Sequence, residues 1–309
     1  MDPHFKAMID AAAKAAEGQP APPPIDVIPP EMVRAGYRMQ RVAQNQNAPQ
    51  DLEVRDLQVD GADGPIGARL YVPKDAPATT PGLVYFHGGG FAIGDLESHD
   101  GHCRRLAAYS GFRVISVDYR LAPENPYPAA LEDTVAGYRE LLAEGIPASR
   151  IVIAGDSAGG NLALVTAIAL RDAGLALPAG LVLLSPWTDM SSSGKSMGSR
   201  AERDRILSVL GISKAAETFA AGLPLADPRL SPLFAKLDGL PPMLVQVGDD
   251  ELLLDDSTRF ATAARKAGVD LRIEIQPKLW HVWQVLAGWM PEADQAITRM
   301  GDFVRGLRH

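Results

Sequence analysis

The chain has 309 residues, 46% of them hydrophobic, and a formal charge of −8 that comes from 38 acidic against 30 basic residues. This length suits one large α/β domain, alone or with an accessory lid, and the acidic balance argues against nucleic acid as a partner. Cys103 is the one cysteine, so no internal disulfide can form. No run approaches the roughly 18 apolar residues of a membrane span. The first residues show no signal-peptide pattern, so we expect a cytoplasmic protein.

The N-terminal part of the chain carries helical patterns and no strand pattern. Apolar residues at helical spacing predict helices over residues 5–17 and 30–42, and a proline-rich connector at 19–30 separates them. Because the first strand pattern begins only at Leu52, we expect these helices to pack as a layer over the rest of the molecule.

The strand patterns predict one sheet. Alternating apolar residues on either side of the turn at 60–64 indicate an antiparallel pair within residues 52–72. Six short apolar runs follow, at 83–86, 114–117, 151–153, 181–184, 243–247 and 271–275. Helical patterns lie mainly between them, at 101–110, 129–143, 159–172, 255–267 and about 292–306. This alternation predicts an α/β fold whose eight-stranded, mostly parallel sheet carries helices on both faces.

One interval breaks the alternation of strands and helices. Between Trp187 and Pro242 there is no strand pattern, and helical patterns occupy 201–209 and 213–221. We therefore expect a helical cap in two parts beside the α/β domain. The predicted bounds are 1–48 for the first part of the cap, 49–188 and 231–309 for the α/β domain, and 189–230 for the second part of the cap.

The segment Gly155-Asp-Ser-Ala-Gly159 joins a β-branched run to an alanine-rich helical pattern. This is the G-x-S-x-G pattern of a nucleophile elbow, in which the strand-to-helix turn exposes the serine hydroxyl at a helix N-terminus. The partial positive charge there favours a developing anion, so Ser157 is a candidate nucleophile. The pattern alone is weak, because small residues are common in loops. It needs a base, an orienting acid and oxyanion donors nearby.

A base and an acid follow in the order that an elbow serine requires. His281 comes after the last strand pattern, at the carboxyl end of the sheet where open α/β folds place their sites. The acid is expected between serine and histidine, after the penultimate strand. The segment Gly248-Asp-Asp-Glu251 lies there, and we predict Asp250 as the acid, with Asp249 as the alternative.

A glycine-rich loop supplies the expected oxyanion donors. His87-Gly-Gly-Gly90 follows the run at 83–86 directly, and three glycines let backbone N–H groups approach a ligand closely. We predict an oxyanion hole formed by the N–H groups of Gly88, Gly89 and Ala158, with His87 pinning the loop.

These motifs together make the chain resemble the bacterial hormone-sensitive-lipase-like (family IV) esterases of the α/β-hydrolase superfamily, over roughly residues 50–305. The matching segments are His87-Gly-Gly-Gly-Phe91 with Gly94-Asp95, Asp118-Tyr-Arg-Leu-Ala-Pro-Glu124 with Pro126-Tyr-Pro-Ala129, Gly155-Asp-Ser-Ala-Gly-Gly-Asn-Leu162, Ser185-Pro-Trp187, and Gly248-Asp-Asp-Glu251 with His281. The resemblance implies a carboxylesterase that hydrolyses short- to medium-chain acyl esters through a Ser-His-Asp triad and an acyl-enzyme. It also implies no metal or cofactor, a cap built from the two helical segments, and a possible homodimer.

The chain departs from the family pattern at the acid of the predicted triad. There the family often has Asp-Pro-Leu, with one residue fewer before the next aspartate. This chain reads Asp250-Glu-Leu-Leu-Leu-Asp255, so the choice of Asp250 depends on how the extra residue is aligned.

Side chains that flank the motifs are candidates for the substrate pocket, with ordinary core packing as the alternative for each. They are Phe91, Trp187, Val282 and Trp283. The segment His99-Asp-Gly-His102-Cys103 looks like a set of metal ligands, but no further ligand cluster completes it, so we predict no metal site. The arginines at 200, 203 and 205 are expected to form a solvated face of a cap helix.

Three other functions use the same motifs. An amidase or an arylester or lactone hydrolase would use the same triad. A catalytically inactive ligand receptor, like some plant hormone receptors of this fold, would lack the histidine, and His281 argues against it. A long-chain lipase is less expected, because the cap segments show no long exposed apolar lid.

Overall fold

The chain folds around one sheet, and the computed structural model describes residues 28–77 and 79–307. The predicted helix at 5–17 and most of the proline-rich connector lie outside these residues. The strands are β1 (Leu52–Gly61), β2 (Gly64–Pro73), β3 (Gly82–Phe86), β4 (Arg113–Val117), β5 (Ile151–Asp156), β6 (Gly180–Leu184), β7 (Met243–Gly248) and β8 (Leu271–Gln276). The α-helices are α2 (Pro30–Gln44), α3 (Leu96–Ser110), α4 (Ala129–Ala143), α5 (Ala158–Asp172), α6 (Ser196–Ser199), α7 (Val209–Ala220), α8 (Leu254–Lys266) and α9 (Pro291–Gly306). Short 3₁₀ helices lie at Asn45–Asn47, Ala148–Arg150, Pro232–Phe234 and Trp283–Leu286.

The eight strands form a single sheet in the order β1-β2-β4-β3-β5-β6-β7-β8. β1 pairs antiparallel with β2, and β2 pairs antiparallel with β4, whereas every pair from β4 to β8 is parallel. The predicted α/β fold with an eight-stranded, mostly parallel sheet is therefore confirmed.

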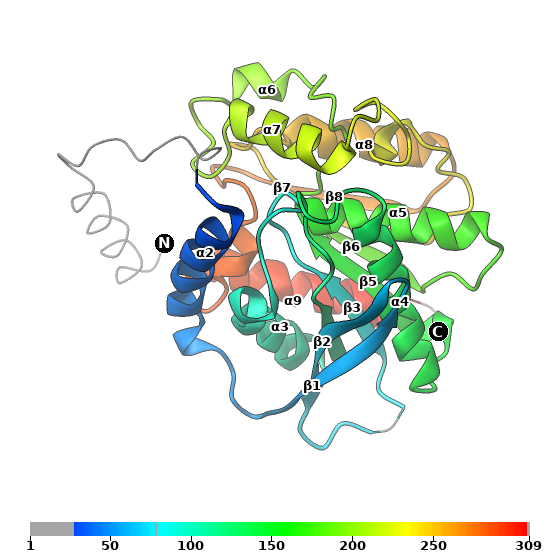
Figure 1. Cartoon of the computed structure of the whole chain (residues 1–309). Helices are drawn as coiled ribbons and strands as arrows, with labels where there is room; N and C mark the ends of the chain where they lie inside the picture. Colours follow the sequence, from blue (N-terminus) through cyan, green and yellow to red (C-terminus); the bar gives the residue numbers. More distant parts are fainter. Residues whose placement is uncertain (1–27, 78, 308–309) are drawn as a thin grey trace.

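The continuous apolar runs are explained by two cores, one on each face of the sheet. Successive side chains of a strand point to opposite faces. In β3, Val84 and Phe86 pack in the core with α4, α5 and α8, whereas Leu83 and Tyr85 pack in the core with α3 and α9. Figure 1 shows these helix layers on the two sides of the sheet. A strand that is buried on both faces needs apolar residues at nearly every position.

The two predicted cap segments lie apart in sequence. Figure 1 shows α6 and α7 above one end of the sheet, whereas α2 lies at its flank, and α2 packs against α3. Within the described ranges, no helix combines the length and the apolarity that crossing a bilayer requires.

The predicted helix at 201–209 is wrong. Residues 201–208 form turns and bends, and α7 begins only at Val209. The Asp204 carboxylate accepts hydrogen bonds from the N–H groups of Ile206 and Leu207 at 2.9 Å each, and from Leu252 N–H at 2.8 Å. Such side-chain bonds compete with helical bonds for the same backbone donors, so the apolar spacing alone is misleading here.

Candidate active site

Ser157 stands in the turn between β5 and α5. Its backbone has φ 54° and ψ −117°, a conformation that L-residues rarely adopt and that is typical of a strained functional turn. The turn is possible because Gly159 lacks a side chain: a Cβ there would overlap the carbonyl oxygen of Phe86. The predicted elbow is thus formed, and it brings the Ser157 hydroxyl to the carboxyl edge of the sheet.

His281 reaches the serine from the loop after β8. The Ser157 hydroxyl lies 2.9 Å from His281 Nε2, at hydrogen-bond distance. Both side chains are buried, with 8% and 5% of their surfaces exposed. The predicted pairing of Ser157 with His281 is therefore present in the structure.

The carboxylate beside the histidine belongs to Glu251. His281 Nδ1 lies 2.7 Å from Glu251 Oε2. The other carboxylate oxygen, Oε1, accepts the Ser185 hydroxyl at 2.8 Å and the Gly248 N–H at 2.6 Å. Glu251 is fully buried, and these three donors compensate the desolvation of its charge.

The prediction of Asp250 in this position is wrong. Asp250 is partly exposed and forms an ion pair of 3.1 Å with Arg203. Asp249, the alternative, accepts the N–H of Lys278 at 2.5 Å. After β7 the chain turns so that the third residue of the turn points inward, and the longer Glu251 side chain occupies the place that Asp250 was expected to fill.

One signal in the sequence could have identified Glu251. If Glu251 takes the place of the family's aspartate, the extra residue before Asp255 disappears and the spacing becomes regular. An elbow serine accepts either Asp or Glu as its third partner, so the spacing outweighs the residue type.

The glycine loop presents a different set of oxyanion donors from the predicted one. The Gly88 N–H donates to Asp156 Oδ1 at 2.8 Å, so it is already engaged. Gly89 has φ 125°, and a Cβ there would overlap the Ile93 carbonyl, so only glycine fits. None of the residues Gly89, Gly90 and Ala158 donates its N–H to another of the described residues. These three amides are the donors that an oxyanion could use, and Gly89 and Gly90 both line the cavity in front of Ser157.

A buried polar and aromatic layer supports the loop from below. His87 Nδ1 lies 2.9 Å from the Gly88 carbonyl oxygen, and its ring stacks on Tyr119 and on His99. The Tyr85 hydroxyl donates to Asp156 Oδ1, the same oxygen that accepts the Gly88 N–H. His87 thus pins the loop, as predicted, and Asp156 ties the loop to the elbow.

The histidines of the segment 99–103 belong to this layer. Burial, reinforced by nearby positive groups including Arg41, holds the pKa of His99 well below its usual value and lowers that of His102 to about 3. Both rings are therefore neutral packing elements at physiological pH. Within the part of the chain that the structure describes, no group of three or more His, Cys, Asp or Glu side chains is placed to hold a metal ion.

A cavity of about 810 Å³ opens in front of Ser157 and His281. Residues of α2 line one part of it, and residues 205–207 of the insertion line another. The remaining lining residues come mainly from the glycine loop and the segment around the histidine: Gly89, Gly90, Ile93, Asp156, Trp280, Val282, Val285 and Leu286.

Of the four predicted pocket residues, one lines the cavity and three do not. Val282 lines the cavity. Phe91 instead stacks on Phe219, with ring centroids 3.7 Å apart, and Trp187 packs beside it. Trp283 is buried in the core under α3 and α9. These three side chains pack in the core, and the neighbouring Trp280, which no motif marks, lines the cavity instead.

The arginines at 200, 203 and 205 do not form one solvated helix face. Arg200 donates to the Asp249 carbonyl at 2.6 Å, and Arg203 pairs with Asp250. Arg205 lies over the Trp280 ring, with its guanidinium carbon 5.2 Å from the ring centroid. Arg205 therefore lines the cavity, whereas Arg200 and Arg203 bind the turn that carries Glu251.

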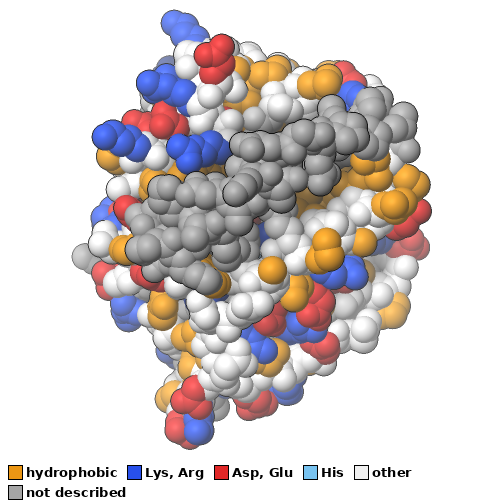
Figure 2. All heavy atoms as spheres, turned by 90° about the vertical axis from the view of Figure 1, so that its left-hand side faces the viewer, with side chains coloured by type: hydrophobic (Ala, Val, Ile, Leu, Met, Phe, Trp, Pro, Cys, Tyr) orange, Lys and Arg blue, Asp and Glu red, His pale blue; other side chains and the backbone are white. Residues whose placement is uncertain are grey.

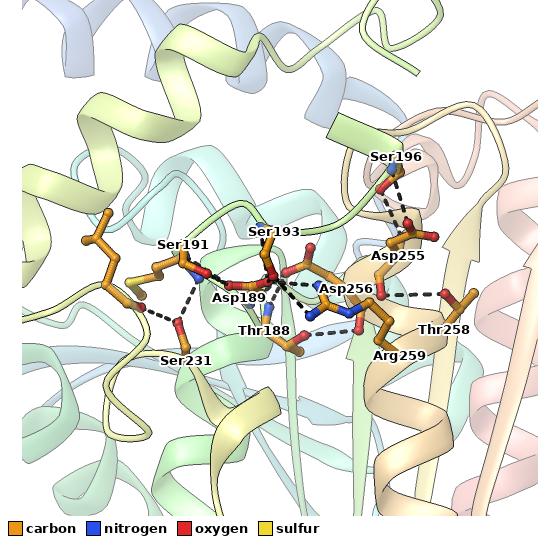
Figure 3. A network of polar contacts seen from close by, with 12 residues as sticks. Thr188, Asp189, Ser191, Ser193, Ser196, Ser231, Asp255, Asp256, Thr258 and Arg259 are labelled. Atoms are coloured by element: carbon orange, nitrogen blue, oxygen red, sulfur yellow. Dashed lines mark hydrogen bonds and ion pairs between the residues drawn. The ribbon is translucent and has the colours of Figure 1, made fainter. Parts of the chain in front are cut away.

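A polar network fastens the start of the insertion to α8 (Figure 3). Asp256 Oδ2 accepts the N–H groups of Thr188 and Asp189, both at 2.7 Å. Asp189 in turn accepts bonds from Ser193 and from Arg259, the latter at 2.9 Å. Because α8 follows the turn that carries Glu251, this network also fixes the root of the insertion relative to the site.

The two aspartates of the network differ in charge state. Burial raises the pKa of Asp256 well above its usual value, and the nearby negative charge of Asp189 adds to this. Burial also pushes the pKa of Asp189 upward, but hydrogen bonds from Ser191 and Ser193 and the Arg259 guanidinium outweigh it and hold that pKa below its usual value. Asp189 therefore carries the negative charge opposite Arg259.

Replacing Asp189 with asparagine is expected to lower the free energy of unfolding by about 2 kcal/mol at neutral pH, because buried charge-assisted hydrogen bonds are lost. The folded pKa of Asp189 lies below its unfolded value of about 3.9, so its contribution is complete above about pH 4 and is lost as the pH falls through the folded value. Urea unfolding at neutral pH and below pH 4 measures both effects.

Asp302→Asn is the matched control, because Asp302 pairs with Arg305 on the surface of α9 and its side chain is 66% exposed. Its replacement should change the free energy of unfolding by less than about 0.5 kcal/mol. Equal effects of the two substitutions would show that the network contributes no more than a surface pair.

Comparison with known proteins gives a consistent picture. A sequence profile described as alpha/beta hydrolase fold matches residues 83–285. The chain is 43% identical over 223 residues to an acetyl-hydrolase of Streptomyces hygroscopicus, which covers 72% of this chain and 75% of that protein. It is 36% identical to the carboxylesterase NlhH of Mycobacterium tuberculosis, over 80% of each chain. The crystal structure of an esterase from the bacterial hormone-sensitive lipase family matches with a TM-score of 0.89 and 38% identity, over 99% of both chains.

Proposed function

Since the chain belongs to the bacterial hormone-sensitive-lipase-like esterases of the α/β-hydrolase fold and is a carboxylesterase, we propose that it hydrolyses short- to medium-chain acyl esters with Ser157 as nucleophile, His281 as base and Glu251 as orienting acid. The observation that carries this proposal is the unbroken line of hydrogen-bond distances, 2.7 Å from Glu251 to His281 and 2.9 Å from His281 to Ser157.

Acylation follows from this geometry. Ser157 Oγ attacks the carbonyl carbon of the ester while its proton passes to His281 Nε2. Glu251 accepts the Nδ1–H, keeps the ring in this orientation and stabilises the imidazolium. The tetrahedral oxyanion accepts hydrogen bonds from the N–H groups of Gly89, Gly90 and Ala158. Collapse of the intermediate breaks the bond to the leaving oxygen, which takes the proton from His281 and departs as an alcohol.

Deacylation reverses these roles. His281 removes a proton from water, and the hydroxide attacks the acyl carbon bound to Ser157. The second tetrahedral intermediate uses the same amides. Its collapse returns the proton to Ser157 and releases the carboxylic acid.

Two features support acyl groups of limited length. The cavity has a volume of about 810 Å³, and α2 and residues 205–207 both form part of its wall. One relative is named an acetyl-hydrolase. We further propose that α2 and the insertion act together as the cap, because both line the cavity. A homodimer and a cytoplasmic location stay predictions.

A chain-length series tests the acyl preference. We expect kcat/KM for p-nitrophenyl butyrate and hexanoate to exceed that for the palmitate ester by at least roughly tenfold, because extra methylenes that find no apolar wall contribute no binding energy. Measurements use monomeric substrate concentrations. A value that rises steadily up to palmitate would favour the long-chain lipase instead.

A further inference from the structure

Arg41 brings a positive charge into the wall of the cavity that contains Ser157 and His281. It lies on α2, and only 9% of its surface is exposed. Its Nη1 donates to Gln44 at 3.0 Å, and its guanidinium carbon lies 6.0 Å from the centroid of the Tyr37 ring. Its Nε is buried and has no hydrogen-bond partner among the described residues.

Other arginines of low exposure in this protein pair with carboxylates. Arg34 pairs with Glu124, Arg69 with three acids, and Arg120 with a fully buried aspartate. In the described ranges, no acid lies at ion-pair distance from Arg41. Arg105 likewise lacks an acid, but it donates to the Gly101 carbonyl outside the cavity. Arg41 thus combines a nearly buried charge, an unused donor and a place in the site.

Two carboxylates of the site already bind other donors. Asp156 also lines the cavity, and its Oδ1 accepts Gly88 N–H and the Tyr85 hydroxyl, whereas no described residue donates a hydrogen bond to its Oδ2. The Glu251 oxygens are taken by His281, Ser185 and Gly248. A guanidinium in a low-dielectric wall gains most from an anion that supplies two acceptor oxygens.

Arg205 adds a second positive charge to the same cavity. It comes from another part of the wall, in the insertion, and its guanidinium lies over Trp280, next to His281 in the chain. Among the described residues, it forms no ion pair, in contrast to Arg203 two residues before. Figure 2 looks onto the side where α2 lies, and lysine and arginine side chains lie together with acidic ones at the upper left of that face.

We propose that the preferred substrates are esters that carry a carboxylate, and that Arg41 binds this carboxylate while Arg205 attracts it from the outer part of the cavity. This inference rests on the proposed function, because it concerns the substrate of the same serine. The half-esters of dicarboxylic acids and the esters of hydroxy acids are the two substrate types that meet the requirement.

Two matched substrate pairs distinguish these types. On the acyl side, p-nitrophenyl hydrogen adipate is compared with its methyl ester, p-nitrophenyl methyl adipate. On the alcohol side, 4-carboxyphenyl butyrate is compared with 4-(methoxycarbonyl)phenyl butyrate. For each pair the quantity of interest is the ratio of kcat/KM for the anionic substrate to that for the neutral one.

Arg41→Met is expected to lower this ratio roughly 10- to 100-fold in one of the pairs, the range for losing a hydrogen bond to a charged group. The pair that responds identifies the side of the ester on which the carboxylate lies. Arg205→Met, at an exposed position whose change is compatible with folding, should lower the same ratio roughly twofold to fivefold. Free adipate should compete with the anionic substrate for the wild type and lose potency in both variants.

Arg38→Met is the control. Arg38 lies one turn earlier on α2 and forms an ion pair of 2.6 Å with Asp95, and its substitution removes the same charge from the same helix. Its ratio should match that of the wild type. A fall of less than tenfold in both pairs for Arg41→Met, or an equal fall for Arg38→Met, would overturn the inference. If the wild type fails to hydrolyse p-nitrophenyl butyrate, the proposed function fails; if it hydrolyses butyrate without this response to Arg41, only the anionic substrate fails.

Discussion

Replacing Glu251 with glutamine is expected to lower kcat roughly 10⁴-fold, the size of effect seen when the orienting acid of a serine triad becomes an amide. Glutamine keeps the shape but removes the charge that stabilises the imidazolium, and its NH₂ group can fix the ring in the wrong tautomer. Glu251 is fully buried, and Ser185, Gly248 and His281 all place a hydrogen-bonding group against its two carboxylate oxygens. Initial rates with p-nitrophenyl butyrate measure the loss.

Asp250→Asn is the matched control for this substitution. Asp250 lies one residue earlier, pairs with Arg203 and is partly exposed, so its replacement should leave kcat within about twofold. Asp249→Asn should behave in the same way. A crippled Asp250→Asn beside an active Glu251→Gln would contradict the assignment, and a urea unfolding curve for each variant separates loss of chemistry from loss of folding.

Replacing Ser157 with alanine should have the largest effect, a fall in kcat of roughly 10⁶-fold, as expected when the nucleophile of such a unit is removed. The oxyanion amides and the cavity persist, so a small residual rate above that in water is expected. His281 loses the hydroxyl at 2.9 Å and has no other nucleophile to activate.

Ser199→Ala, at an exposed serine at the end of α6, is the control for this change and should keep full activity. Butyrate hydrolysis by Ser157→Ala at more than about one per cent of the wild-type rate would mean that another group forms the acyl-enzyme. Mass spectrometry of the variant after acyl-enzyme trapping identifies such a group.

The sheet could be predicted from the sequence because burial on both faces leaves a strong pattern. Strands such as β3 and β5 are apolar at nearly every position, and each alternates between the two cores. The helices between them follow the apolar period, so their predicted bounds agree with α4, α5 and α8 to within about two residues. The positions of Ser157 and His281 could be predicted equally well, because each follows the end of a strand that the pattern predicts.

Side-chain direction inside turns could not be predicted in the same way. Three consecutive carboxylates follow β7, and only the path of the turn decides that Glu251 points inward while Asp250 reaches Arg203. Likewise the engagement of Gly88 by Asp156 depends on residues 68 positions apart. No periodic pattern encodes either contact, since both arise from how two loops meet at the edge of the sheet.

The substrate pocket was the least predictable part. Motif neighbours such as Phe91 and Trp283 are close in sequence to reactive residues, but their side chains face the cores. The cavity wall comes instead from α2 and from residues 205–207, which lie far from the motifs in the chain. Arg41 therefore gave no signal in the sequence, although it is the charged group of α2 that enters the cavity.

The most direct test of the central claim is the rate at which a fluorophosphonate labels the protein, followed by peptide mapping, in the wild type, Glu251→Gln and Asp250→Asn. Labelling reports the nucleophile and its activation without dependence on the natural substrate. We predict a single adduct on Ser157, formed at similar rates in the wild type and Asp250→Asn and far more slowly in Glu251→Gln. An adduct on another residue, or slow labelling of Asp250→Asn with normal labelling of Glu251→Gln, would contradict the Ser157–His281–Glu251 assignment.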